Sequence, residues 1–228
     1  MEQHARLSAL LETYSDHIGI HLGLEQLKQF MVYLEELQRW NRSINLTSIS
    51  SGEEIIIKHF VDSFACLAIE QMQHGANLLD VGTGAGFPGI PLKLVRPDLN
   101  ITLIEPVQKK VSFLYFIVGL LRLEQVHIFY GTLEQFMAHG HNDPLFDYIT
   151  TRALKYNVLL QNGPSLLTNR GRAILYLSHP INRSELSSPW SIVVEKRFDL
   201  PMNFGQRLIL ILSTSENERF GVPRGTLN

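Results

Sequence analysis

A glycine-rich turn at the end of a short apolar segment constrains the fold of this chain most strongly. Leu78 and Leu79 lead through Asp80 into the turn, and apolar residues then recur at helical spacing from Leu92. This pattern is typical of a parallel strand that feeds a helix. Glycines let the main chain approach a ligand, because they carry no side chain. The sequence therefore predicts a nucleotide-type binding loop with three glycines, Gly82, Gly84 and Gly86.

The residues around these glycines separate three kinds of loop. A phosphate-binding P-loop ends in Gly-Lys-Ser/Thr, whereas this one continues as Gly86-Phe87-Pro88. The dinucleotide fingerprint needs a glycine at its sixth position, where this chain has Phe87. What remains is a carboxylate, Asp80, two residues before Gly82. Such a loop suits S-adenosylmethionine, whose cationic amino-acid portion gains from a nearby carboxylate.

Length, charge and cysteine content limit the class of protein. A chain of 228 residues fits one domain with an appendage. The net charge of -2 argues against a non-specific nucleic-acid binder, although residues 1–80 carry -6 and residues 81–228 carry +4. Cys66 is the only cysteine, which fits a reducing compartment. The N-terminus shows no secretion signal and the longest apolar run, 113–121, is too short to span a bilayer, so we expect a cytoplasmic protein without a membrane segment.

Residues 1–72 predict an N-terminal helical cap that is part of the same unit as a methyltransferase-type domain over residues 73–228. Within the cap, Lys58 and Asp62 lie four residues apart on one helix face. They form either a surface ion pair or an anchor that holds the helical segment against the glycine loop. Apolar residues recur at helical spacing over 7–14, 24–40 and 53–69.

From residue 77 onward strands alternate with helices, which predicts an α/β fold with a mostly parallel sheet. Glu105 ends the second strand, where a carboxylate can accept both hydrogen bonds of a ribose diol. Thr132 caps a short helix after the third strand, so Leu133 and Glu134 offer an adenine an apolar face and an acceptor. The expected later strands are 101–105, 126–130, 146–154, 173–177, 193–198 and 208–212.

The end of the fourth strand excludes several methyl-transfer chemistries. Methylation of an exocyclic amine usually shows Asn/Asp-Pro-Pro-aromatic there, and this chain does not. Methylation at C5 of cytosine needs a nucleophilic cysteine, yet Cys66 precedes the sheet. Arg152 remains as a fixed cation at the reaction edge or as a structural ion-pair partner. The pair His139-Gly140-His141 has no third ligand nearby, so we expect no metal.

Five segments in order over residues 40–154 resemble the glucose-inhibited division protein B family. They are Trp40-Asn41-x-x-x-Asn45-Leu46-Thr47, Lys58-His59-x-x-Asp62-Ser63, the loop from Asp80 to Pro91, Lys109-Lys110-x-x-Phe113-Leu114, and Phe146-Asp147 followed by Arg152-Ala153. One feature departs from the family: its members usually have Lys-Gly after the fifth strand, and here Leu177 leads into Ser178-His179.

The resemblance implies a Rossmann-like class I S-adenosylmethionine-dependent methyltransferase sheet with an N-terminal helical cap. It further implies transfer of a methyl group from S-adenosylmethionine to N7 of a guanine in 16S ribosomal RNA, with that RNA or the small ribosomal subunit as partner. The cofactor contacts that it carries over by position are Gly82, Phe87, Leu133, Glu134 and Arg152.

Guanine N7 has an in-plane lone pair and no proton, so its methylation needs alignment and electrostatics rather than a general base. We therefore expect Arg152 to be the catalytic residue, orienting the guanine through O6 or its phosphate. The expected cofactor-binding residues are Asp80, Gly82, Gly84, Gly86, Phe87, Glu105, Leu133, Glu134 and Arg152. The expected RNA contacts are Lys93, Arg96, Lys109, Lys110 and Lys155.

Two other functions stay open at this stage. A non-catalytic nucleotide- or RNA-binding assembly protein would explain the missing Lys-Gly and the acidic N-terminal third. A dinucleotide oxidoreductase rests on Gly82, Gly84 and Glu105 alone. The sequence specifies neither the nucleotide modified nor the oligomeric state.

Overall fold

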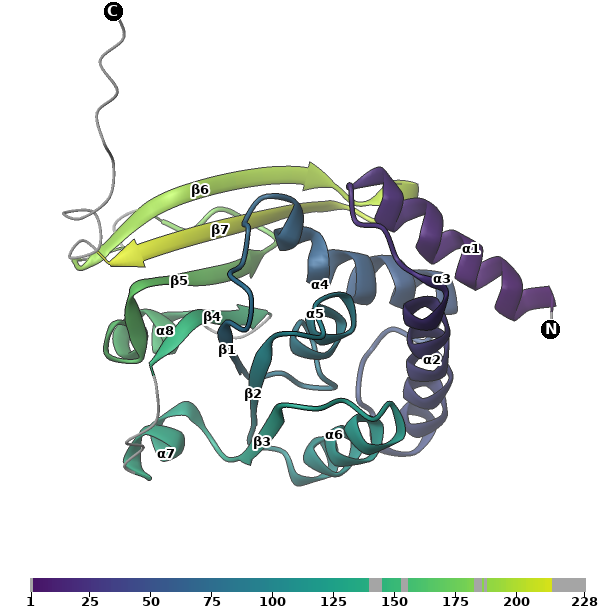
Figure 1. Ribbon diagram of the computed structural model, residues 1–228, viewed down its shortest axis with the longest axis horizontal. Helices are drawn as coiled ribbons and strands as arrows, with labels where there is room; N and C mark the ends of the chain where they lie inside the picture. The colour runs from purple at the N-terminus through teal and green to yellow at the C-terminus, as the bar shows by residue number, and fades with distance from the viewer. Residues whose placement is uncertain (1, 140–144, 153–155, 183–185, 187, 215–228) are drawn as a thin grey trace, which may run out of the picture.

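The sheet that the sequence predicts is present. A computed structural model describes residues 2–139, 145–152, 156–182, 186 and 188–214 of the chain, and within them seven strands form one sheet in the order β3-β2-β1-β4-β5-β7-β6 (Figure 1). The strands are β1 (Asn77–Val81), β2 (Asn100–Glu105), β3 (Val126–Tyr130), β4 (Phe146–Arg152), β5 (Leu167–Leu177), β6 (Trp190–Asp199) and β7 (Gln206–Thr214).

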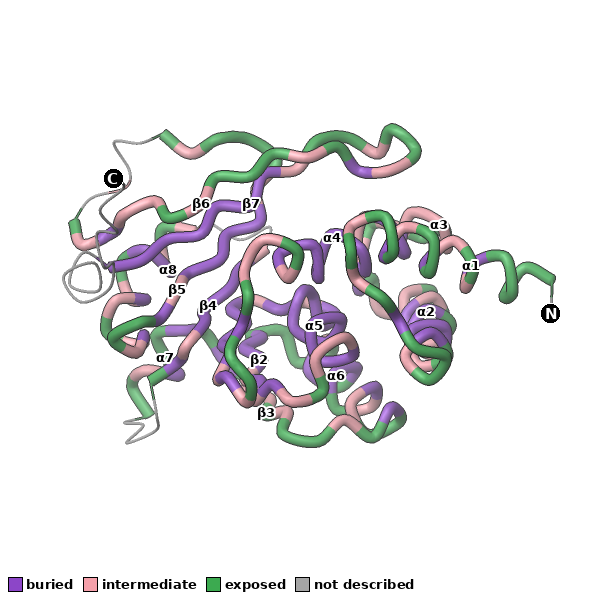
Figure 2. The backbone as a smooth tube through the Cα atoms, turned by 45° about the horizontal axis from the view of Figure 1, so that its top comes forward, coloured by how far each residue is buried: buried purple, intermediate pink, exposed green. Residues whose placement is uncertain are grey.

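Strands β1 to β5 pair in parallel, so their carboxyl ends meet at one edge of the sheet. β7 pairs antiparallel with both β5 and β6, so the last two strands form a hairpin at the end of the sheet. β7 is buried over most of its length, whereas its neighbour β6, at the edge of the sheet, is largely exposed (Figure 2). This difference explains why β7 reads as a continuous apolar run and β6 does not.

Helices cover both faces of the sheet. The cap helices with α5 and α6 share one buried cluster with one face, and α7 and α8 contribute to a second cluster on the other. The helices are α1 (Glu2–His17), α2 (Leu24–Ile44), α3 (Gly52–Ile55), α4 (Asp62–Phe64), α5 (Gly89–Val95), α6 (Gln108–Leu120), α7 (Leu133–Ala138) and α8 (Asn157–Asn162), with short 3-10 turns η2 (Ala65–Ala68), η3 (Gly163–Ser165) and η5 (Pro201–Asn203).

Helix α2 attaches the cap to the rest of the molecule by standing beside α5 and α6 (Figure 1). The side chain of Gln26 donates to the carbonyl of Leu94 at the end of α5, at 2.8 Å. Phe30 and Tyr33 are fully buried in the cluster that also holds Leu103 of β2. The cap and one face of the sheet therefore share a continuous apolar core.

The third cap helix expected over 53–69 is irregular. A π-helical turn, η1 (Ile56–Val61), interrupts it between α3 and α4. π-helical turns are rare and frequently occur at functional sites. This one carries Lys58 and His59, which face the carboxyl edge of β4 through their contacts with Arg152.

Candidate active site

The glycine turn lies between β1 and α5 at the carboxyl edge of the sheet. Gly84 and Gly86 have φ of +64° and +103°, which L side chains rarely adopt. A Cβ on Gly86 would lie 2.8 Å from the Tyr33 hydroxyl, which donates to the carbonyl of Ala85 at 2.6 Å. Helix α2 of the cap therefore braces the loop directly.

Asp80 holds the glycine loop in place by two hydrogen bonds. Its Oδ2 accepts hydrogen bonds from Thr83 Oγ1 at 2.6 Å and from the Gly89 amide at 2.9 Å. Burial raises the pKa of Asp80 to about 6, although the bonds from Thr83 and Gly89 act in the opposite direction. The Asp80 side chain is fully buried, and its hydrogen bonds fix the glycine loop. Its expected place among the cofactor-binding residues stays a prediction.

An open pocket of about 470 Å³ lies on the α7 and α8 side of the same edge. Leu133 and Glu134 begin α7 there, after Thr132 caps the helix by accepting from the Gln135 amide. Both residues thus line a pocket at the edge where the sequence places them, and their contact with an adenine stays a prediction. The rest of the lining is mostly apolar and comes from Val81, Gly82, Ile104, Pro106, Thr132, Thr151, Val158 and Leu159.

Glu105 ends β2 beside this pocket and is almost fully buried. Its Oε2 accepts from the Gly84 amide at 2.8 Å, and its Oε1 accepts from the Val107 amide at 2.9 Å. The carboxylate thus links the glycine loop to the second strand.

Arg152, at the end of β4, lies on the cap side of the edge. Its Nη1 donates to the Lys58 carbonyl at 2.9 Å and lies 3.4 Å from Asp62 Oδ2, and its Nη2 lies 2.9 Å from His59 Nδ1. The guanidinium carbon stands 5.0 Å from the centre of the Phe87 ring, a cation–π arrangement. Arg152 is therefore held by the cap as well as by the sheet.

Phe87, the residue that breaks the dinucleotide fingerprint, is the centre of an aromatic stack. The His59 ring lies 4.5 Å from it at an interplanar angle of 18°, and the Tyr33 ring lies 5.5 Å away at 23°. The stack joins the loop, α2 and the π-helical turn into one buried unit.

Asp62 is buried and forms ion pairs with two arginines rather than with Lys58. Its Oδ2 accepts from Arg152 and, at 3.2 Å, from Nε of Arg207 on β7. Lys58 pairs instead with Glu54, at 2.6 Å. The expected Lys58–Asp62 surface pair is therefore wrong. Asp62 ties this segment to β4 and β7, and the contact with the glycine loop comes from His59, whose ring stacks on Phe87.

Two of the expected RNA contacts are wrong. Lys93 is buried, and its Nζ donates to the carbonyls of Pro97 and Leu99. Arg96 follows α5 at the amino edge of the sheet, where Asp98 and the carbonyls of residues 72 and 73 accept its N–H groups. Neither side chain is positioned to meet a substrate at the carboxyl edge.

The other three expected RNA contacts are Lys109, Lys110 and Lys155. Lys109 is exposed and Lys110 half-buried in the first turn of α6, after the carboxyl end of β2, so their contact with RNA stays a prediction. Lys155 lies outside the described residues.

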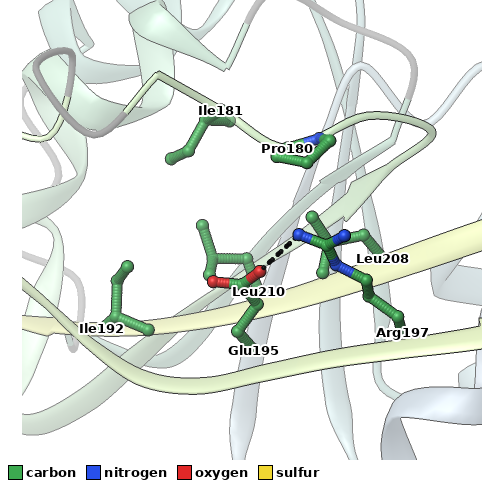
Figure 3. Close-up of a pocket in the computed structure, with 7 residues that line it drawn as sticks. All are labelled: Pro180, Ile181, Ile192, Glu195, Arg197, Leu208 and Leu210. Atoms are coloured by element: carbon green, nitrogen blue, oxygen red, sulfur yellow. Dashed lines mark hydrogen bonds and ion pairs between the residues drawn. The ribbon is translucent and has the colours of Figure 1, made fainter.

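A second, smaller pocket, of about 150 Å³, lies beside the β6–β7 hairpin, and its lining residues are drawn in Figure 3. Leu208 and Leu210 of β7 line it. Glu195 and Arg197, which form an ion pair at 3.1 Å, also line it. It shares no lining residue with the larger pocket.

No three His, Cys, Asp or Glu side chains of the described residues are grouped to hold a metal ion. His139 belongs to these residues, whereas Gly140 and His141 lie outside them. None of the described helices has the length and apolar character needed to cross a membrane.

The sequence interpretation missed Tyr33, His59 and Arg207 as parts of this site. His59 lies within the segment Lys58-His59-x-x-Asp62-Ser63, which was a usable signal. Nothing in the local sequence of Tyr33 indicates its contact with Ala85, 52 positions away. Likewise, nothing near Arg207 indicates its contact with Asp62, 145 positions away.

Comparisons with known proteins agree with this geometry. The family GidB, described as rRNA small subunit methyltransferase G, matches residues 26–196. The ribosomal RNA small subunit methyltransferase G of Desulfitobacterium hafniense is 34% identical over 215 residues, covering 91% of this chain and 89% of that protein. The enzyme of the same name from Streptococcus agalactiae is 35% identical over 221 residues, covering 92% and 93%.

Solved structures show the same fold. A ribosomal protein L11 methylase from Lactobacillus delbrueckii superposes with a TM-score of 0.53 at 16% identity, covering 69% of this chain and 78% of that one. A precorrin-6y C5,15-methyltransferase from Geobacter metallireducens gives 0.52 at 11% identity, covering 67% and 87%. The fold is thus that of the class I S-adenosylmethionine-dependent methyltransferases, with an N-terminal helical cap. Together with the family match, this shows that the chain belongs to the rRNA small subunit methyltransferase G family.

Proposed function

We propose that this protein transfers a methyl group from S-adenosylmethionine to N7 of a guanine in 16S ribosomal RNA. The observation that carries the proposal is the pocket of about 470 Å³ between the glycine loop and α7, in a chain of this family. The substrate class implies a cytoplasmic protein that acts on 16S ribosomal RNA or on the small ribosomal subunit.

The residues present fit S-adenosylmethionine. The pocket is mostly apolar, as an adenine requires, and it has Glu134 as an acceptor at its rim. Glu105 stands at the end of β2, where carboxylates bind ribose hydroxyls. A Cβ on Gly84 would meet nothing within 4 Å, which leaves room for a ligand against the loop. We propose Gly82, Gly84, Gly86, Phe87, Glu105, Leu133, Glu134 and Arg152 as the cofactor-binding residues, with Asp80 supporting the loop.

When bound, S-adenosylmethionine supplies a methyl group on a cationic sulfur. The task left to the protein is alignment, because guanine N7 has no proton to remove. Arg152 has two donors, Nε–H and one Nη2–H, without a partner among the described residues. Such a pair binds a carboxylate, a phosphate or a guanine O6. We propose that Arg152 uses it to orient the reacting groups.

Cys66 offers no covalent alternative. It is fully buried in the cap, and burial raises the pKa of its thiol to about 12. A thiolate nucleophile of the kind used for C5 methylation is therefore not available from this side chain at neutral pH.

We also propose that residues 1–72 are a cap within the same folding unit as residues 73–228. The support is the shared core, in which Phe30 and Tyr33 of α2 pack in one cluster with β2. A single unfolding transition for the whole chain would agree with this division, and a separate earlier transition of the cap would contradict it.

The test is methyl transfer from labelled S-adenosylmethionine to 16S ribosomal RNA and to small subunits from a strain lacking this protein. One new N7-methylguanine in either substrate is expected, with its position found by mapping. Tight cofactor binding without incorporation into either substrate would contradict catalysis and favour the non-catalytic assembly protein.

A further inference from the structure

The hydrogen bonds around His59 give this residue a role that its position in the cap does not suggest. Resting on the proposed methyl transfer, we propose that His59 is a positioning residue, whose Nδ1 is a fixed hydrogen-bond acceptor that sets the orientation of the Arg152 guanidinium. His59 touches neither the open pocket nor, on this proposal, the substrate; it acts through Arg152.

The two neighbours of the His59 ring determine where its proton lies. Arg152 carries only N–H donors, so the contact of 2.9 Å between its Nη2 and Nδ1 requires Nδ1 to accept. The proton is then on Nε2, which donates to Thr47 Oγ1 at 2.8 Å. Thr47 is itself fixed, because its amide donates to Asn41 Oδ1 at 2.8 Å. Arg152 therefore fixes the tautomer, and the turn after α2 supplies an acceptor for the proton on Nε2.

The surroundings keep this ring neutral. It is stacked on Phe87, and the cations of Arg152, Arg207 and Lys58 all disfavour a further positive charge. Burial, followed by the charge of Arg152, lowers the pKa of His59 to about 3. Nδ1 consequently remains an acceptor throughout the physiological pH range.

Three acceptors from η1 and α4 surround Arg152: the Lys58 carbonyl, Asp62 Oδ2 and His59 Nδ1. They occupy both Nη atoms and leave Nε–H with the remaining Nη2–H for a ligand. A guanidinium binds an anion bidentately only when its plane is correctly oriented. The Lys58 carbonyl and Asp62 bind the same nitrogen, Nη1, so His59 is the group that fixes the rotation of the plane at Nη2.

Two substitutions separate the acceptor from the ring. His59→Asn can place an amide oxygen near the position of Nδ1, whereas His59→Gln reaches the position of Nε2 and leaves Arg152 without that acceptor. Both variants lose the stack on Phe87 equally, so a purely structural role predicts equal effects. We expect similar melting temperatures, cofactor affinities within threefold of each other, and a single-turnover rate lower in His59→Gln by about 10- to 100-fold, the range of one charge-assisted hydrogen bond.

A double mutant tests whether His59 acts through Arg152. In an Arg152→Lys background, adding His59→Gln should lower the rate no further, because the guanidinium is already absent. Nitrogen-15 NMR of the wild-type protein adds a measurement that needs no variant. It should show the Nε2–H tautomer between pH 5 and pH 8.

The outcomes distinguish this inference from the proposed function. If the wild-type protein methylates no ribosomal RNA, the proposed function fails. If the wild type is active but His59→Asn and His59→Gln lose equal activity, or the NMR spectrum shows a proton on Nδ1, the inference fails and the proposed function stands.

Discussion

The carboxyl edge of the sheet has two sides that are built in opposite ways. On the cap side, Phe87, His59, Asp62 and Arg152 are packed against one another, with Arg152 held by three acceptors. On the side of α7 and α8, mostly apolar residues line a pocket of about 470 Å³. From this difference we infer a division of labour: the cap fixes the groups that align the reaction, and the open side accepts most of the cofactor. Substitutions on the cap side should therefore lower mainly the methyl-transfer rate, and substitutions on the open side should lower mainly the cofactor affinity.

The largest effect is expected from Arg152→Ala. Loss of a preorganised cation should lower the methyl-transfer rate about 100- to 1,000-fold, the range for removing one electrostatic stabiliser of a transition state. Cofactor affinity, measured by calorimetry, should fall much less, because Arg152 is one of several proposed cofactor contacts and the pocket on the α7 side is untouched. Equal losses of rate and affinity would show that the two sides do not divide these tasks.

Asp62→Asn tests the stability of the packed side. The change leaves Arg152 and Arg207 without their shared charge and places an amide group where Asp62 Oδ1 is buried with no hydrogen-bond partner in the described part of the chain. We expect the free energy of unfolding in urea to fall by about 3 kcal/mol. Glu54→Gln, which breaks the more exposed pair with Lys58, is the matched control and should cost less than about 1 kcal/mol. Similar costs for both variants would argue against a specially stabilising role for Asp62.

Two loop glycines sharpen the comparison further. A Cβ on Gly86 would lie 2.5 Å from Ile90 Cδ1 and 2.8 Å from the Tyr33 hydroxyl, so Gly86→Ala should cost about 2 kcal/mol of stability. Gly84→Ala meets nothing within 4 Å and should cost about 1 kcal/mol through its positive φ. Its methyl group enters the space beside the loop, where the cofactor is proposed to bind. Relative to its cost in stability, Gly84→Ala should therefore lose more cofactor affinity than Gly86→Ala. Parallel urea unfolding and calorimetry measure both quantities.

A pH dependence of stability is expected from His59. Its pKa is lowered to about 3 in the folded protein, so the unfolded chain binds the extra proton below its ordinary value of 6.5. The stability that this residue contributes is complete above pH 6.5 and is lost as the pH falls toward 3, by about 1.4 kcal/mol per pH unit. The difference in unfolding free energy between the wild type and His59→Asn should shrink accordingly on acidification.

Asp80 has the opposite sign, since its folded pKa is raised to about 6, and it favours the folded state as the pH falls. It is present in both proteins, so the difference between them isolates His59. A difference that stays constant between pH 6.5 and pH 4 would contradict a neutral, buried His59.

Local patterns predicted the frame of the molecule because they act over short distances. The strand that ends in Glu105 and the cap formed by Thr132 depend on neighbours in sequence, and both are found. Lys93 shows the limit of such reasoning. It reads as a cation available to RNA, yet α5 is buried around nearly its whole circumference, and backbone carbonyls bind the Nζ.

The packed side of the edge could be predicted only in part. The segment Lys58-His59-x-x-Asp62 stood out in the sequence, but its meeting with Arg152, 90 or more residues away, depends on how the cap docks. The pairing of Lys58 with Glu54 and of Asp62 with two arginines occurs at the π-helical turn and beside it, and the local sequence predicts neither the turn nor the two distant arginines.

A crystal structure with S-adenosylhomocysteine bound would test the division between the two sides most directly. The account predicts the adenosine in the pocket beside Leu133 and Glu134, the ribose hydroxyls at Glu105, and an Arg152 guanidinium that keeps its contacts with His59 and Asp62. A ligand bound on the cap side of the loop, or an Arg152 that leaves His59 when the pocket is filled, would contradict it.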